Sequence, residues 1–276
     1  MEEFYSWQKL HRILDSTLMT SDRHEFDPDE FRKDINGVRP IELWNELQPR
    51  LTQTGKHLYC IGDTGNVVTK RYLVWKATQD PDLVHYVPGN HDYLIHCKRL
   101  GYTERDYVAF IPEGVYAEHG DIVDPFWSRD EKWTKTKALR LVLGNGIIRV
   151  SDVFERVDVM SDERAISLVT FLHDKIVPRG LRLNGTKYDD RAKDLSAVHP
   201  WIKVYVHGHD HRAAYRRLQD GLIRVDLNSW MHSKEDGPSD WHRKGEVAPY
   251  LFGVDTWNLY KVTKDGLVTV VQGDRQ

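Results

Sequence analysis

The stretch WIKVYVHGHDH (201–211) decides the fold, because a short run of strand-forming apolar residues ends abruptly in glycine, histidine and aspartate. The same plan recurs in STLMTSDRH (16–24), HLYCIGD (57–63), LVHYVPGNHD (83–92) and GVYAEHGD (114–121). Such runs predict buried strands with Asp, Asn or His at their carboxyl ends. Because open α/β sheets bind ligands just beyond the carboxyl ends of their strands, we expect these polar ends to meet at one edge.

Helical patterns and a final hairpin complete the predicted architecture. Residues 41–51 and 72–78 have the spacing of helices that pack on a sheet. LIRVDLNSW (222–230) indicates a further strand, and residues 258–272 predict a hairpin across Asp265-Gly266. The predicted fold class is therefore α/β, a two-sheet β-sandwich flanked by helices.

The chain carries no repeat, low-complexity tract or linker, so we predict one domain over residues 1–276. The stretch 125–200 is mostly helical in pattern and is predicted to be a helical cap inserted in that domain. Because it leaves and returns between two strand ends, we expect this cap to cover substrate as well as the main fold.

The composition narrows the class of protein. The 276 residues include 39 Lys+Arg against 42 Asp+Glu, a net charge of −3, which argues against binding nucleic acid through bulk charge. Two cysteines, Cys60 and Cys97, cannot build a disulfide framework and favour a reducing compartment. No segment approaches the roughly 20 apolar residues of a membrane span. We therefore expect a cytoplasmic protein, with a peripheral position at the inner face of a membrane as the alternative.

Five clusters of candidate metal ligands stand at the predicted strand ends. They are Asp22-Arg23-His24, Gly62-Asp63, Gly89-Asn90-His91-Asp92, His119-Gly120-Asp121 and Gly208-His209-Asp210-His211. Each alone is weak evidence, because short motifs often occur by chance. Together they favour a pair of divalent transition ions, which bind imidazole nitrogen and carboxylate or amide oxygen. Two neighbouring dications repel each other, so a carboxylate should lie between them, and Asp63 is the natural bridge.

The order of the five clusters resembles the signature of the calcineurin-like metallophosphoesterases: Asp-x-His, Gly-Asp, Gly-Asn-His-Asp/Glu, a later His, and Gly-His-x-His. The resemblance implies an α/β/β/α architecture and two divalent ions, Mn²⁺ first, with Fe, Zn and Mg as alternatives. It also implies a ligand set in which Asp22, His24 and His211 hold one ion, Asp63 bridges, and Asn90, His119 and His209 complete the second.

The remaining polar residues are assigned supporting parts. A water or hydroxide shared by the two ions is the expected nucleophile, and His91 is predicted to assist the leaving group, with Asp92 orienting its ring. Arg212 is expected to be solvated or ion-paired, with contact to a substrate phosphate as the alternative. The expected partners of the metal-bound histidines are Asp121 and Asp210. His207 is predicted to be a buried strand residue, either in the core or in contact with the metal ligands. If the first motif is wrong, Asp15, Asp27 or His11 replaces it.

The resemblance implies hydrolysis of a phosphomonoester, phosphodiester or pyrophosphate in a small-molecule, nucleotide or lipid-linked substrate. The His-Gly-Asp triplet at 119–121, the insertion and the Gly-His-x-His-Arg ending look most like UDP-2,3-diacylglucosamine pyrophosphohydrolases, although His91 stands where that subgroup tends to have arginine. A nuclease or nucleotide phosphodiesterase is one alternative, with a phosphate track of Lys132, Lys135, Lys137, Arg140 and Arg149. A catalytically inactive protein-binding scaffold is the other.

Overall fold

The computed structural model describes residues 3–23, 40–64, 79–87, 89, 108–111, 114–123, 186–209, 213–227, 230 and 249–273. Within these ranges the chain forms two mixed sheets. The seven-stranded sheet has the order β1-β12-β11-β10-β2-β3-β4. Its strands are β1 (Phe4–Ser6), β2 (Thr17–Ser21), β3 (His57–Ile61), β4 (Val84–Val87), β10 (Tyr250–Gly253), β11 (Leu259–Thr263) and β12 (Gly266–Val271).

The five-stranded sheet has the order β5-β6-β7-β9-β8. Its strands are β5 (Val108–Ile111), β6 (Val115–Glu118), β7 (Val204–His207), β8 (Ala213–Arg217) and β9 (Ile223–Leu227). The helices are α1 (Pro40–Gln53) and α8 (Thr186–Val198), with short 3-10 turns η1 (Trp7–Arg12), η4 (Asp121–Val123) and η5 (Gln219–Gly221).

Each sheet contains a parallel core that brings strand ends together. β2, β3 and β4 are parallel neighbours in the first sheet, and β6, β7 and β9 are parallel neighbours in the second. Within each set, therefore, all carboxyl ends reach the same edge of the sheet. The residues that follow β2, β3, β6 and β7 belong to four of the five clusters picked out in the sequence.

Alternation along the strands divides the apolar residues between two faces. Met19, Ile61 and Val206 point between the sheets into a common core, whereas Leu18 and Leu58 point to the opposite face of the first sheet. The sandwich is therefore held by apolar side chains from both sheets, each removed from water.

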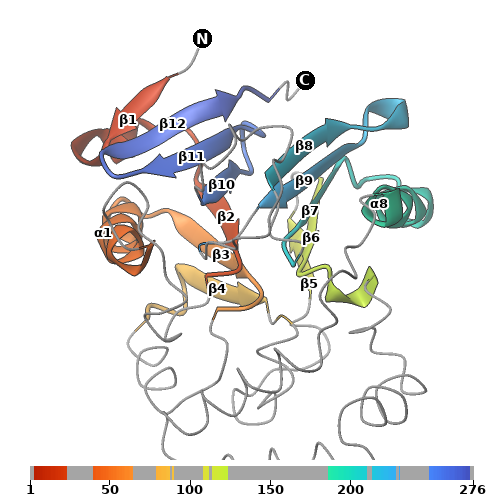
Figure 1. Ribbon diagram of the computed structural model, residues 1–276, viewed down its shortest axis with the longest axis horizontal. Coiled ribbons are helices and arrows are strands. Elements are labelled where there is room, and N and C mark those ends of the chain that lie inside the picture. Colours follow the sequence, from red (N-terminus) through yellow and green to blue (C-terminus); the bar gives the residue numbers. More distant parts are fainter. Residues whose placement is uncertain are drawn as a thin grey trace, which may run out of the picture.

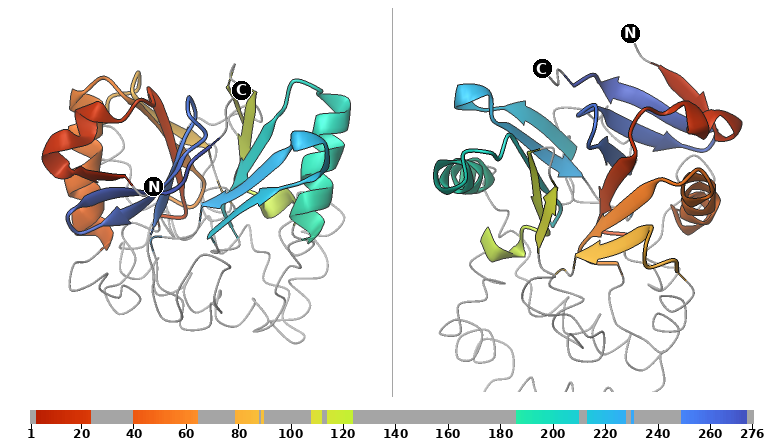
Figure 2. Two further views of the ribbon diagram at one scale, coloured as in Figure 1. Left: turned by 90° about the horizontal axis from the view of Figure 1, so that it is seen from above. Right: turned by 180° about the vertical axis from the view of Figure 1, so that it is seen from behind.

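A helix covers the outer face of each sheet, and Figures 1 and 2 show the resulting four layers. Leu43, Trp44, Leu47 and Leu51 lie on one face of α1, at helical spacing, and pack on the first sheet. Tyr188, Ala192 and Leu195 of α8 pack against the second sheet together with Tyr116 and Tyr205. The predicted two-sheet α/β class is confirmed.

Most of the predicted elements match the structure. The five strand-and-polar-end stretches form β2, β3, β4, β6 and β7, the tail forms β9 and the β11–β12 hairpin, and residues 41–51 lie within α1. The helix predicted at 72–78 lies outside the described residues. Of the predicted insertion, residues 186–200 are described, and they place α8 on the sandwich. Residues 125–185 lie outside the description, so the cap stays a prediction. No helix in the described part of the chain is long and apolar enough to cross a membrane.

Candidate metal centre

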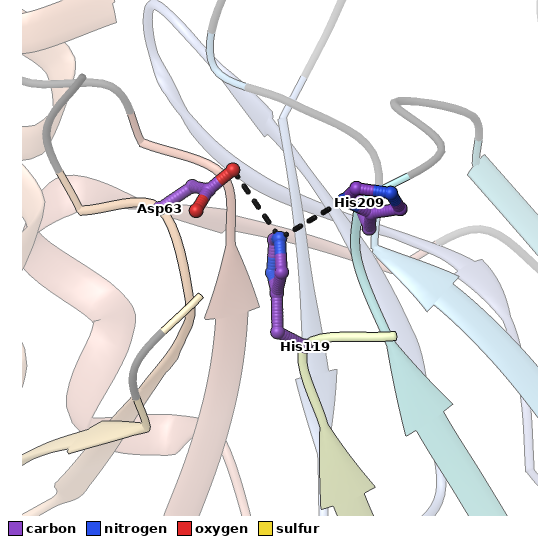
Figure 3. Close-up of side chains that lie close together, drawn as sticks. All are labelled: Asp63, His119 and His209. Carbon is purple, nitrogen blue, oxygen red and sulfur yellow. Dashed lines mark hydrogen bonds and ion pairs between the residues drawn. The ribbon is translucent and has the colours of Figure 1, made fainter. Parts of the chain in front are cut away.

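Asp63, His119 and His209 converge at the seam between the two sheets (Figure 3). Asp63 follows β3 in the first sheet, while His119 and His209 follow β6 and β7 in the second. His119 Nε2 lies 3.2 Å from Asp63 Oδ2 and 3.2 Å from His209 Nδ1. Potential ligand atoms of all three residues lie within 4.8 Å of one another. One cation could therefore contact two imidazoles and a carboxylate here.

Asp22, directly after β2, borders the same group. Its Oδ1 lies 4.0 Å from His119 Nε2, and its Oδ2 accepts a hydrogen bond from the backbone N–H of His209 at 2.9 Å. The Ser21 hydroxyl also contacts this carboxylate. Asp22 thus joins the end of β2 to the loop that follows β7. We call Asp22, Asp63, His119 and His209 the metal centre, as a candidate site for a cation.

The backbone turns sharply at three of these four residues. Asp22, Asp63 and His209 have φ values of 49°, 46° and 70°, in the left-handed region. This conformation costs a non-glycine residue about 1 kcal/mol, although Asp, Asn and His tolerate it better than most residues. Such backbone outliers concentrate at functional sites, where neighbouring contacts hold them in place.

Glycines allow the four side chains to approach so closely. A Cβ atom on Gly62, whose φ is 74°, would lie 2.1 Å from His119 Nδ1, and one on Gly89 would lie 2.2 Å from Asp63 Oδ1. A Cβ on Gly208 would lie 2.1 Å from Asp22 Oδ2. Each glycine of the Gly-Asp, Gly-Asn-His-Asp and Gly-His motifs therefore leaves space that a ligand side chain occupies.

The surroundings of His119 fix which nitrogen faces the metal centre. Its Nδ1 lies 3.2 Å from the Ile61 carbonyl oxygen, an acceptor, so Nδ1 carries the hydrogen and donates it. In the neutral ring, the lone pair then resides on Nε2, the nitrogen nearest Asp63 and His209. A carbonyl partner on the far nitrogen is the usual way in which proteins orient a metal-binding histidine.

The electrostatics of the metal centre favour positive charge. Burial lowers the pKa of His119, but the carboxylates of Asp63 and Asp22 outweigh it and raise that pKa well above its ordinary 6.5. Asp121, buried two residues later, acts in the same direction. The same negative potential would attract a divalent cation, and imidazole nitrogen with carboxylate oxygen suits Mn, Fe or Zn. The residues present fit a transition ion.

The structure accounts for several further sequence predictions. His207 is fully buried at the end of β7, as predicted; burial and the charge of Arg224 lower the pKa of its ring well below 6.5. Asp15, the alternative to Asp22, precedes β2 at the opposite end of that strand. Its carboxylate accepts hydrogen bonds from Tyr260 OH at 2.6 Å and from the Thr256 N–H at 2.8 Å. Asp15 therefore belongs to a different network. Cys60 is a buried free cysteine in β3.

Sequence reasoning missed two contributors. Ser21 Oγ lies 2.6 Å from the Ile61 carbonyl oxygen, which also receives His119 Nδ1, so Ile61 links both sheets at the metal centre. Neither a backbone carbonyl nor a lone serine gives a sequence signal. The candidate site residues that lie outside the described ranges keep their roles as predictions; they are His24, Asn90, His91, Asp92, Asp210, His211 and Arg212, together with Asp27 and the basic residues Lys132, Lys135, Lys137, Arg140 and Arg149.

Comparison with protein-family models and with curated proteins finds no match. Among solved structures, a conserved protein of Streptococcus pneumoniae described as a predicted phosphoesterase is 12% identical with a TM-score of 0.42, covering 93% of each chain. A dimetal phosphatase of Danio rerio is 12% identical with a TM-score of 0.43, covering 93% of this chain and 100% of its own. Vps29 of Chaetomium thermophilum is 14% identical with a TM-score of 0.43, covering 90% and 88%. These values are too low to transfer an activity.

Proposed function

We propose that the protein is a metal-dependent hydrolase of phosphoric esters. The observation that carries this proposal is the meeting of Asp63, His119 and His209, whose potential ligand atoms lie within 4.8 Å of one another at the seam of the sandwich. A divalent cation in such a site supplies a Lewis acid for phosphoryl oxygens and lowers the pKa of a nearby water.

Four of the described residues would supply the groups that bind the cation. Asp63 supplies a carboxylate from the first sheet, and His119 supplies Nε2 from the second, oriented by the bond from its Nδ1 to Ile61. His209 presents Nδ1 from the loop after β7. Asp22 adds a second buried negative charge 4.0 Å from His119 Nε2. Two carboxylates in one buried site favour more than one positive charge there.

That charge supports the finer proposal of two divalent ions with Asp63 between them. The motif resemblance assigns Asp22, His24 and His211 to one ion, and Asn90 with His119 and His209 to the other, Mn²⁺ being the first candidate. The same resemblance assigns assistance of the leaving group to His91, oriented by Asp92, and a phosphate contact to Arg212. Gly89, directly before Asn90, and His209, two residues before His211, are both described.

For the substrate, we propose a pyrophosphate or ester of the kind cleaved by UDP-lipid pyrophosphohydrolases. The motif resemblance supports this choice through the His119-Gly120-Asp121 triplet, and the predicted cap at 125–200 would enclose the lipid. A nuclease of the same chemistry is the second candidate, for which the basic residues between Lys132 and Arg149 would bind phosphates.

The activity is tested with the Mn²⁺-loaded protein on p-nitrophenyl phosphate and bis(p-nitrophenyl) phosphate. We expect bound Mn²⁺ by equilibrium dialysis and hydrolysis of at least one ester. We expect His119→Gln to lose the metal and to lower kcat/KM about 100-fold or more, because a ligand from the centre of the site is removed. The matched control is His85→Gln, which changes a half-buried histidine near the amino end of β4 and should retain both properties.

The possible results separate the candidate functions. Hydrolysis of a UDP-linked lipid, with no action on oligonucleotides, supports the lipid substrate, while oligonucleotide cleavage with a steep salt dependence supports the nuclease. Mn²⁺ binding without hydrolysis of any tested phosphate would contradict an enzyme and favour a scaffold. Absence of metal binding by the unaltered protein would contradict the metal centre itself.

A further inference from the structure

The peptide unit between Gly208 and His209 is held at both of its polar ends. Its carbonyl oxygen accepts a hydrogen bond from His207 Nδ1 at 2.9 Å, and its N–H donates to Asp22 Oδ2 at 2.9 Å. The preceding Gly208 N–H donates to the His119 carbonyl oxygen at 3.0 Å. The chain entering His209 is thus tied to β7, to Asp22 and to His119.

These ties matter because the backbone of His209 is left-handed, with a φ of 70°. Rotation of the 208–209 peptide plane changes ψ of Gly208 and φ of His209 together, so such a rotation would return His209 to an ordinary conformation. It would also withdraw the His209 N–H from Asp22 Oδ2 and turn the Gly208 carbonyl oxygen toward that carboxylate. The bond from His207 to the Gly208 carbonyl therefore opposes a motion that would separate Asp22 from the loop that carries His209.

Neighbouring aromatic rings fix the orientation of the His207 ring. It is fully buried and stacks on Tyr188 of α8, with ring centroids 4.1 Å apart and an interplanar angle of 8°. Tyr205 stacks at 5.2 Å. Gly120 lies so close that a Cβ there would be 3.2 Å from Tyr188 and 3.4 Å from the Cβ of His207. Stacking on both tyrosines therefore opposes rotation of the ring away from the Gly208 carbonyl.

The hydrogen bonds also assign the tautomer of His207. Among the described residues, its buried Nε2 has no hydrogen-bond partner. A hydrogen on Nε2 would leave a buried donor unsatisfied and would point the Nδ1 lone pair at a carbonyl oxygen. The hydrogen therefore sits on Nδ1, the nitrogen that faces Gly208.

We propose that His207 is a positioning residue of the metal centre, whose Nδ1–H holds the Gly208–His209 peptide so that His209 presents its imidazole to the cation. Tyr188 of α8 keeps the ring in place. This inference rests on the metal binding proposed above.

The test compares Mn²⁺ dissociation constants of the full-length protein by isothermal titration calorimetry. His207→Phe keeps an aromatic ring for stacking but removes the N–H, and we expect about a 10-fold weaker affinity, as for loss of other groups that orient metal ligands. In His207→Asn, the side-chain amide places a donor where Nδ1 was, so we expect its Mn²⁺ affinity to be closer to that of the unaltered protein. His207→Gln places its donor one bond farther out and should bind more weakly than His207→Asn.

Leu195→Ala is the matched control for general destabilisation. Leu195 packs in the same layer between α8 and the second sheet as Tyr188, so its truncation should lower Tm while leaving the Mn²⁺ affinity unchanged. Co²⁺-loaded samples add a second measurement, because their visible absorption reports the geometry around the ion. We expect a changed spectrum in His207→Phe alone.

The possible outcomes separate the role of His207 from the proposed metal binding itself. Unchanged affinity in His207→Phe would overturn the inference, as would affinities that follow Tm across all variants, Leu195→Ala included. If His207→Phe does not fold, equal affinities of the Asn and Gln variants overturn it. An unaltered protein that binds no Mn²⁺ would instead refute the proposed function.

Discussion

At the scale of single residues, the metal centre depends on conformations that most side chains avoid. Asp22, Asp63 and His209 have left-handed backbones, and Gly62, Gly89 and Gly208 stand where any side chain would collide with them or with their neighbours. Space therefore requires all three glycines, because a Cβ atom would collide with Asp22, Asp63 or His119, and the positive φ of Gly62 is a second requirement at that position.

We predict that Gly62→Ala destabilises the protein far more than Gly55→Ala. Both glycines have a φ of 74°, but nothing lies within 4 Å of a Cβ on Gly55, whereas a Cβ on Gly62 would lie 2.1 Å from His119 Nδ1. Gly55→Ala should cost about 1 kcal/mol for the backbone alone. Gly62→Ala should cost about 3 kcal/mol, because His119 must also move. Urea unfolding measures both, and equal losses would show that crowding at Gly62 has no effect.

The sequence predicted that Asp63, His119 and His209 would lie close together, because Asp and His residues that follow buried strands are easily recognised. It could not predict that the Ile61 carbonyl would receive both Ser21 and His119. Nor could it predict that His207 would donate to the Gly208 carbonyl. These contacts depend on backbone atoms, which every residue has, and on the relative placement of two sheets.

At the scale of elements, prediction succeeded where an apolar run had a clear polar end. β1, β5, β8 and β10 were not predicted. β8 reads Ala-Ala-Tyr-Arg-Arg and has an exposed end, and β10 reads Tyr-Leu-Phe-Gly and is followed directly by Val254 instead of a polar residue. Both are strands because neighbours pair with them, β9 in one case and β2 with β11 in the other. Such pairing is a tertiary effect that local propensity does not carry.

The parallel pair β3–β4 should make stability depend on pH. His57 Nδ1 lies 3.2 Å from His85 Nε2, and Tyr59 stacks on His85. Burial, followed by the nearby His57, lowers the pKa of His85 below 6.5. Between that lowered pKa and 6.5, His85 binds more protons in the unfolded chain than in the folded one. The contribution of His85 to folding stability should therefore rise with pH through this window and level off above 6.5.

Urea unfolding at pH 5.5 and pH 7.5 measures this contribution. We expect the gain between the two pH values to be smaller in His85→Gln than in the unaltered protein, while His11→Gln, which changes an exposed histidine of η1, keeps the full gain. A full gain in His85→Gln would assign the pH dependence to other groups.

In the complete fold, an ion pair between a partly exposed arginine and a buried glutamate attaches the outer helix α8 to the second sheet. Arg191 donates from Nε to Glu118 Oε1 and from Nη2 to Glu118 Oε2, both at 3.0 Å. Tyr116 and Tyr205 donate to the same carboxylate at 2.9 Å each. Glu118, which ends β6 next to His119, is thus satisfied by groups from three elements.

Arg191→Met should therefore lower the free energy of unfolding by about 2 kcal/mol, because a nearly buried carboxylate loses a charged partner. The control is Arg50→Met, which breaks an exposed pair with Glu46 on α1 and should cost no more than about 0.5 kcal/mol. Chemical denaturation compares the two variants directly. Similar small losses would indicate that the tyrosines alone satisfy Glu118.

The placement of the metal ligands along the chain has a consequence for assembly. Asp22 and Asp63 come from one half of the sandwich, and His119 and His209 come from the other, separated by as many as 187 residues. No fragment containing one half alone contains all four of these candidate ligands, and a nascent chain brings them together only after the last of these segments has docked. An ion bound by all four would therefore stabilise the folded chain against separation of the two halves.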